Sequence, residues 1–255
     1  MKYGSAYLPY LLCQIEELSL GADRHVEFVD FCAEMKADSD RRYVDPLLFW
    51  HLEPSSPDPG LSAPVHAVHF SPALPDRWIA RDLDPQRGFS ITTEEDRLTL
   101  TVADGARAIL GELNAPRLLR ECHGDFAIEA RLTDLNVGGP TFGGLVIDRG
   151  EEGLILFGKA TRMKSGVHLE QWRRGRLHVI GRGLLQGDFL HLRMERRGSR
   201  VRALCRDEHS SWMSCGELDV SDDPTLFAGL FARTPERYPS SRVVFSRVEL
   251  IPSAP

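Results

Sequence analysis

The chain has 255 residues and a formal net charge of −6, with 31 Lys and Arg against 37 Asp and Glu. This excess of negative charge argues against nucleic acid or an anionic membrane as a partner, because both attract a positively charged surface. The five cysteines are odd in number and form no close pairs, which predicts reduced thiols in a cytoplasmic protein. We expect no signal peptide, because the apolar run Ala6–Leu12 is short and lacks a small-residue cleavage pattern.

The first 52 residues are predicted to form a short helical region. Apolar residues recur at helical spacing over 7–37, and Asp45-Pro46 is typical of a helix start. We expect this region to pack on the rest of the chain, on a second copy of it, or on a partner protein. Residues 53–64 follow as a predicted linker, since three prolines and a glycine between Glu53 and Gly60 exclude a helix and a central strand.

Residues 65–251 have the pattern of a β-sandwich. Short segments of alternating apolar and polar residues recur roughly every 11 residues, which is the spacing of strands in a sandwich or barrel. The clearest are Gly143–Asp148, Leu154–Phe157, Gly166–Trp172, Leu177–Ile180, Phe189–Glu195 and Val201–Cys205.

Several loose motifs in this region occur in a familiar order. They are Ala115-Pro-Arg-Leu-Leu, Gly124-Asp-Phe-Ala-Ile, Gly143-Gly-Leu-Val-Ile, Arg193-Met-Glu-Arg-Arg-Gly, Trp212 and Phe227-Ala-Gly-Leu-Phe-Ala232. In this order they resemble the bacterial concanavalin A-like jelly rolls, including the C-terminal accessory domains of β-xylosidases. The resemblance implies a mainly β, antiparallel jelly-roll sandwich. It does not fix the function, because this fold carries lectins, glycosidases and plain interaction modules.

One predicted strand presents an aromatic ring and two kinds of hydrogen-bonding group on the same face. Val167 and Leu169 alternate with His168, Glu170 and Trp172, and period-two geometry places the two sets on opposite faces. Sugar sites in sandwiches of the resembling family use such an aromatic platform. We therefore predict a ligand site at these three residues, completed by the preceding Lys159 and Arg162, for a glycan or small sugar-like ligand.

A second, catalytic interpretation rests on Glu217-Leu-Asp219-Val-Ser-Asp222. This segment resembles the Glu-x-Asp-x-x-Glu signature of concanavalin A-like glucanases, with the last acid replaced by Asp. Retaining glycosidases need a nucleophile and an acid whose carboxyl groups lie about 5 Å apart. The segment also fits an ordinary strand end, because Asp222-Asp-Pro224 is typical of a turn.

Metal and cofactor motifs are missing from the sequence. A strand at His66-x-x-His69 would place the two rings on opposite faces, and Cys205, His209 and Cys215 lack zinc-site spacing. There is no nucleotide-binding glycine loop and no Gly-x-Ser-x-Gly elbow. We therefore expect no metal and no cofactor. The favoured function is a non-catalytic, carbohydrate-type binding module, and a glycoside hydrolase using Glu217 or a purely structural interaction domain are the alternatives.

Overall fold

The computed structural model of the chain describes residues 52–61, 66–68, 77–81, 90–94, 97–102, 108–109, 112–113, 117–136, 141–160, 166–173, 176–185, 189–222, 225–233 and 241–252. All of these belong to a compact unit formed by residues 52–255, and residues 1–51 form a separate unit. The predicted N-terminal helices lie outside the described residues. The described part is mainly β, as the alternating pattern predicts.

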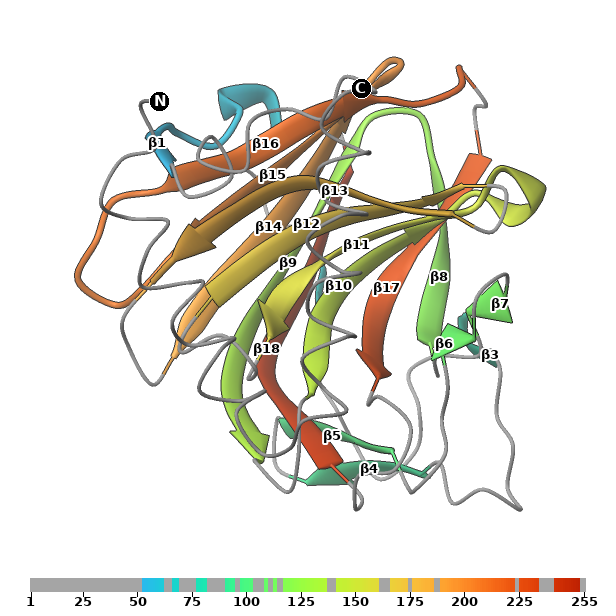
Figure 1. Cartoon of the computed structure of the whole chain (residues 1–255), viewed down its shortest axis with the longest axis vertical. Coiled ribbons are helices and arrows are strands. Elements are labelled where there is room, and N and C mark those ends of the chain that lie inside the picture. Colours follow the sequence, from blue (N-terminus) through green and yellow to red (C-terminus); the bar gives the residue numbers. More distant parts are fainter. Residues whose placement is uncertain are drawn as a thin grey trace, which may run out of the picture. The chain divides into compact units, whose positions relative to one another are not determined.

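Two antiparallel sheets make up the unit (Figure 1). Sheet A has the strand order β1-β16-β15-β14-β9-β18-β5-β4, and β2 pairs with β18. Its strands are β1 (Glu53–Pro54), β2 (His66–Val68), β4 (Ser90–Glu94), β5 (Arg97–Val102), β9 (Phe126–Asn136), β14 (Leu190–Arg197), β15 (Arg200–Arg206), β16 (Met213–Asp219) and β18 (Ser241–Pro252).

Sheet B has the strand order β13-β12-β11-β10-β17-β8-β3. Its strands are β3 (Trp78–Arg81), β8 (Arg117–His123), β10 (Phe142–Asp148), β11 (Leu154–Ala160), β12 (Gly166–Arg173), β13 (Arg176–Leu184) and β17 (Thr225–Arg233). A small hairpin, β6 (Ala108–Ile109) with β7 (Glu112–Leu113), and two 3-10 turns, η2 (Pro59–Leu61) and η4 (Gly150–Glu152), complete the described elements. No helix in the described ranges has the length and apolar character needed to cross a membrane.

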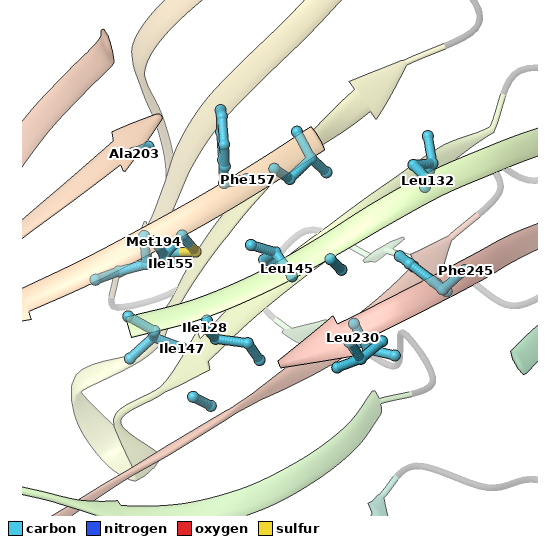
Figure 2. Packing of buried hydrophobic residues seen from close by; sticks show 14 of the residues in the cluster. Ile128, Leu132, Leu145, Ile147, Ile155, Phe157, Met194, Ala203, Leu230 and Phe245 are labelled. Atoms are coloured by element: carbon cyan, nitrogen blue, oxygen red, sulfur yellow. The ribbon is translucent and has the colours of Figure 1, made fainter. Parts of the chain in front are cut away.

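The hydrophobic core lies between the facing sides of the two sheets. Alternate residues of β9 and β14, such as Ile128 and Met194, pack in one cluster with Leu145 of β10 and Phe157 of β11 (Figure 2). The strands β10 to β12 match the predicted segments, and the apolar half of each alternating pattern supplies the core. Each fully buried side chain of this size contributes roughly 1.5–3 kcal/mol by leaving water.

The Pro-rich segment predicted to be a linker belongs to the sandwich unit from Leu52 onward. We call residues 52–61 the strap. Its backbone pairs with β16 through Glu53 and Pro54, and Leu61 is buried against Ala127 and Ile251 on the outer face of sheet A. Proline limits the strap to the two-residue edge strand β1 and the 3-10 turn η2, but it does not prevent the segment from being bound along its length.

Arginines of sheet A hold the strap in place. Arg197 donates two hydrogen bonds to the carboxylate of Asp58, at 2.7 and 2.9 Å. The buried guanidinium of Arg193 donates to the Leu61 carbonyl at 2.7 Å, and the Asp58 amide donates to Glu195 at 2.9 Å. Such charge-assisted, partly bidentate bonds are stronger than neutral ones. The strap therefore forms part of the outer surface of sheet A.

Candidate functional site

The strand β12 divides its side chains between the core and the outer face of sheet B. Val167 and Leu169 are fully buried in the core between the sheets, so His168, Glu170 and Trp172 lie on the other face. The sequence predicted that these three side chains lie on one face of the strand, and the structure agrees. His168 and Glu170 are nevertheless only 7% and 4% exposed, and a solvated sheet edge would leave them far more accessible.

The outer face of sheet B carries a second hydrophobic cluster, which explains this burial in part. Trp172 packs against it together with Phe227. All seven residues of β10 are buried, so that strand is covered on both faces. The site is therefore set in an apolar surface of low dielectric, where unpaired polar groups are costly. The cluster consists of Leu119, Phe142, Val146, Leu154, Leu156, Ala160 and Phe231.

Arg233 is a component of this site that the sequence did not reveal. Its guanidinium donates to Glu170 Oε2 at 2.8 Å, and its Cζ lies 4.7 Å from the centre of the Phe142 ring and 5.9 Å from that of Trp172. Arg233 belongs to β17, which is separated from β12 by β11 and β10 in the sheet. Phe227, Phe231 and Arg233 alternate along β17, and this pattern places the arginine on the outer face. Its proximity to β12 depends on the order of the strands in the sheet, which the local pattern does not contain.

Two glycines make room for the aromatic part of the site. Gly158 is the cross-strand partner of both His168 and Gly144, and Gly144 is in turn the partner of Phe231. This row thus has no side chains between His168 and Phe231. The Phe142 ring contacts both residues, with centroid distances of 5.8 Å to His168 and 5.0 Å to Phe231. A Cβ at Gly144 or Gly158 would lie 2.2 Å from a carbonyl oxygen of the neighbouring strand, so glycine also allows β10 and β11 to approach closely at this row.

The charges in the site are set by burial and by Arg233. Burial, followed by the nearby Arg182 and Arg233, lowers the pKa of His168 despite Glu170 beside it, so the ring is neutral near pH 7. Burial alone would raise the pKa of Glu170, but Arg233 and His168 outweigh it and the pKa is lowered. The 3.6 Å contact between His168 Nδ1 and Glu170 Oε1 therefore joins a neutral ring to a carboxylate, and it exceeds hydrogen-bond length.

Three buried nitrogens of the site have no hydrogen-bond partner among the described residues. They are Nε2 of His168, Nε1 of Trp172 and Nε of Arg182, and Arg182 pairs with His168 across β12 and β13. Because Nδ1 of the neutral His168 faces the Glu170 carboxylate, we assign the proton to Nδ1, which leaves Nε2 as an acceptor. Buried polar groups are normally satisfied, so an unpaired acceptor beside unpaired donors is typical of a place for a polar ligand.

The other two residues predicted for this site do not join it. Lys159 follows Ile155 and Phe157 at period two on β11, and both of those side chains lie in the core. Lys159 thus projects to the face opposite His168, and its inclusion in the site was wrong because adjacent positions of a strand alternate in direction. Arg162 lies outside the described residues.

The carboxylates of the catalytic interpretation lie on the other sheet. Glu217 and Asp219 share the outer face of β16 and both approach Arg200, at 3.3 and 3.8 Å. Glu217 lines a pocket of about 210 Å³ with Asp58, Glu195, Arg197, Arg200 and Arg202. Asp222 is exposed beyond the end of the strand. In the described ranges, no group of three or more His, Cys, Asp or Glu side chains could hold a metal ion.

Comparisons with known proteins identify the fold. No family model and no curated protein sequence matches the chain. A functionally unknown protein from Saccharomyces cerevisiae is similar, with a TM-score of 0.58 and 14% identity over 70% of this chain and 98% of its own. Xylan β-1,4-xylosidase from Bacillus halodurans has a TM-score of 0.52 and 16% identity, over 71% of this chain but only 38% of its own. A LamA variant from Zobellia galactanivorans, in complex with laminaritriose and laminaritetraose, has a TM-score of 0.50 and 12% identity, over 74% and 100%. At these identities the likeness shows a shared β-sandwich fold.

Proposed function

We propose that this chain is a non-catalytic, carbohydrate-type binding domain of the concanavalin A-like jelly-roll kind. Its ligand site is the outer face of sheet B around His168, Glu170, Trp172 and Arg233. The observation that carries the proposal is the set of unpaired, buried ring nitrogens beside two aromatic rings. The names of two similar structures, a xylan xylosidase and a protein bound to laminari-oligosaccharides, add support for a carbohydrate ligand.

A sugar ring matches the chemistry of this site. The hydroxyl groups of a sugar can donate to His168 Nε2 and accept from the Trp172 ring N–H, because each hydroxyl is both a donor and an acceptor. The faces of Phe142 and Trp172 suit the C–H surface of a pyranose, while the polar groups fix its orientation. Arg233 keeps 17% of its side chain exposed and Trp172 is partly exposed, so a ligand would approach from their side.

Two substitutions at Trp172 separate the two contributions to binding. Trp172→Phe retains a ring but removes the N–H donor, and we expect affinity for hydroxylated ligands to fall roughly fivefold, since one hydrogen bond contributes about 1 kcal/mol. Trp172→Ala removes the ring as well and should weaken all ligands further. Calorimetric titration with laminaritetraose and xylotetraose measures both, after a glycan array has identified other ligands.

The matched control is Trp78→Phe, which makes the same change in the core between the sheets. It should leave affinity unchanged. Glu170→Gln is expected to alter which sugars are preferred, because it replaces an acceptor by a group that also donates. Full affinity in Trp172→Ala together with a lowered melting temperature would show that the ring only stabilises the fold and would overturn the proposed site.

The alternative of a glycoside hydrolase is tested in the same preparation. Glu217 borders a pocket, so a panel of chromogenic glycosides should be assayed with the native chain and with Glu217→Gln. We expect no turnover above background in either. Turnover that survives purification and disappears in Glu217→Gln would replace the binding function by a catalytic one.

A further inference from the structure

A row of basic residues crosses the outer face of sheet A, on the opposite side of the sandwich from the proposed sugar site. His191 of β14 pairs with Arg206 of β15 on one side and with Arg131 of β9 on the other, and Arg131 pairs with Arg247 of β18. The neighbouring Leu192 is in the core, so these four side chains point outward. Four adjacent strands thus present basic residues at the same level.

The members of this row differ in how their charge is balanced. Arg131 bonds to Glu208 at 2.5 Å, and Arg247 bonds to Glu249 at 2.6 Å. Arg206 has no ion pair or hydrogen bond with any residue of the described ranges, and its Nε is buried without a partner. Its Cζ lies 4.9 Å from the centre of the Trp212 ring. Stacking on an aromatic face orients the guanidinium and leaves its donors unused.

His191 lies beside this arginine in the same aromatic cluster. Its ring is nearly perpendicular to Trp212, at 76°, with centroids 6.4 Å apart. Within the part of the chain that the structure describes, its Nδ1 is buried without a hydrogen-bond partner, and the Glu129 carboxylate lies 3.9 Å away, beyond hydrogen-bond length.

The charges around His191 keep its ring neutral. Burial, then Arg206, Arg131 and Arg247, lower the pKa of His191 to about 4, with Glu208 acting in the opposite direction. The contact with Glu129 is therefore no ion pair near pH 7. The three arginines lie around an uncharged ring, and Arg206 remains without a counter-charge in the described ranges.

We propose that Arg206, held over Trp212 and next to His191, binds an oxyanion on the outer face of sheet A. The ligand is a carboxylate, sulfate or phosphate group, because the planar guanidinium matches two oxygens of such a group. Arg131 is oriented in a similar way, with its Cζ 4.4 Å from the centre of the Phe189 ring, and it flanks the opposite side of His191. Both guanidinium groups are preorganised, which reduces the entropy lost on binding. This site is independent of the proposed sugar site.

The imidazole of His191 reports occupancy directly. A bound anion stabilises the imidazolium, so it must raise the pKa of His191 from about 4, and by linkage the affinity for the anion must rise as pH falls. Nuclear magnetic resonance of the histidine C–H signals, at constant ionic strength adjusted with chloride, follows this shift while sulfate, phosphate or acetate is added. The chain has nine histidines, and comparison with His191→Gln assigns the signal.

Variants of two outward-facing arginines on β15 decide whether the site is specific. Arg206→Gln should weaken sulfate binding roughly tenfold, the effect of losing a charge-assisted bond of about 1.5 kcal/mol. Arg200→Gln removes an arginine of the same strand that already faces Glu217 and Asp219, and should change nothing. No saturable shift with any of the three anions, or an equal shift in Arg206→Gln, would overturn the proposal.

A final comparison of glucuronate with acetate defines the source of the anion. Tighter binding of glucuronate would show that the oxyanion is carried on a sugar, and equal binding that the anionic group alone is recognised. Both outcomes support the oxyanion site. A shift of the His191 signal by glucose at the same concentrations as by glucuronate would contradict it, because glucose has no charge to match Arg206.

Discussion

At the scale of single residues, the pair of Glu170 and Arg233 stabilises the apolar outer face of sheet B as well as forming its polar centre. Both side chains are largely buried and are joined by a 2.8 Å hydrogen bond. Removing one partner of a buried pair leaves the other charge without compensation. The same pair therefore has two measurable roles, one in ligand preference and one in stability.

Glu170→Gln should lower the free energy of unfolding by roughly 3 kcal/mol, because Arg233 then remains partly buried without its counter-charge. Urea unfolding followed by tryptophan fluorescence measures this. The matched control is Glu217→Gln, which removes the exposed partner of Arg200 and should cost less than about 1 kcal/mol. Equal losses in both variants would show that the burial of Glu170 has no energetic consequence.

The buried histidines should make stability depend on pH above the range in which carboxylates titrate. The pKa of His191 is about 4 in the folded chain and near 6.5 in an unfolded one. The unfolded chain thus binds more protons between these values, so stability is complete above pH 6.5 and declines as pH falls towards 4. His168, whose pKa is also lowered, adds to the same trend.

His191→Gln should therefore flatten the decline in the free energy of unfolding between pH 6.5 and 4. Denaturant titrations at half-unit pH intervals measure the slope. His209→Gln, which replaces an exposed histidine, is the control and should leave the slope as it is. An unchanged slope in His191→Gln would contradict the neutral state assigned to this ring.

At the scale of elements, the strands were predictable and the contacts between distant strands were not. Period-two alternation in Gly166–Trp172 correctly places Val167 and Leu169 in the core, because the pleat fixes the direction of each side chain. The sequence indicated the burial of the outer face of sheet B only weakly. The indication is the continuous apolar run of β10, which is typical of a strand covered on both sides. The approach of Arg233 to β12 depends on the order of strands in sheet B, and no local pattern contains that order.

The strap shows a related limit of sequence reasoning. Prolines at positions 54, 57 and 59 exclude an α-helix and a central strand, and the strap has only the edge strand β1 and the 3-10 turn η2. The same composition predicted a linker, because it does not reveal that Arg193, Arg197 and Arg202 are aligned to receive this segment. Arg202 donates to the Ser56 carbonyl at 3.0 Å and to Glu195 at 2.5 Å. These arginines come from positions more than 130 residues later in the chain.

Strong acid should release the strap, at a lower pH than the decline caused by His191. The hydrogen bonds from Arg197 and from the Gly60 amide lower the pKa of Asp58, against a small opposing effect of burial. This contribution to stability is fully present above the unfolded pKa near 3.8 and is lost as pH falls through the lower folded pKa. Asp58→Asn should impose the loss at neutral pH, seen as faster amide exchange at Gly60 and Leu61. Unchanged exchange rates there would refute the role of Asp58, and Asp222→Asn is the control.

At the scale of the whole molecule, the strap belongs to the sandwich unit, which starts at Leu52. Leu52 packs against the core, and the strap supplies partners to buried groups of sheet A. Among these is Glu195, which is only 2% exposed. A sandwich that starts after the strap would leave such groups unsatisfied, whereas one that starts at Leu52 retains every contact of the strap described above.

Two truncated chains test this boundary. Residues 52–255 should fold cooperatively, because they contain the complete core. Residues 62–255 should be less stable than residues 52–255 by roughly 3–6 kcal/mol, since Arg193 and Glu195 each lose a buried hydrogen bond costing about 1–3 kcal/mol and the buried Leu61 is removed. Urea unfolding of the two chains gives the difference. Equal free energies of unfolding would mean that water replaces the contacts of the strap at no cost. Residues 53–61 would then be a linker, as the sequence predicted.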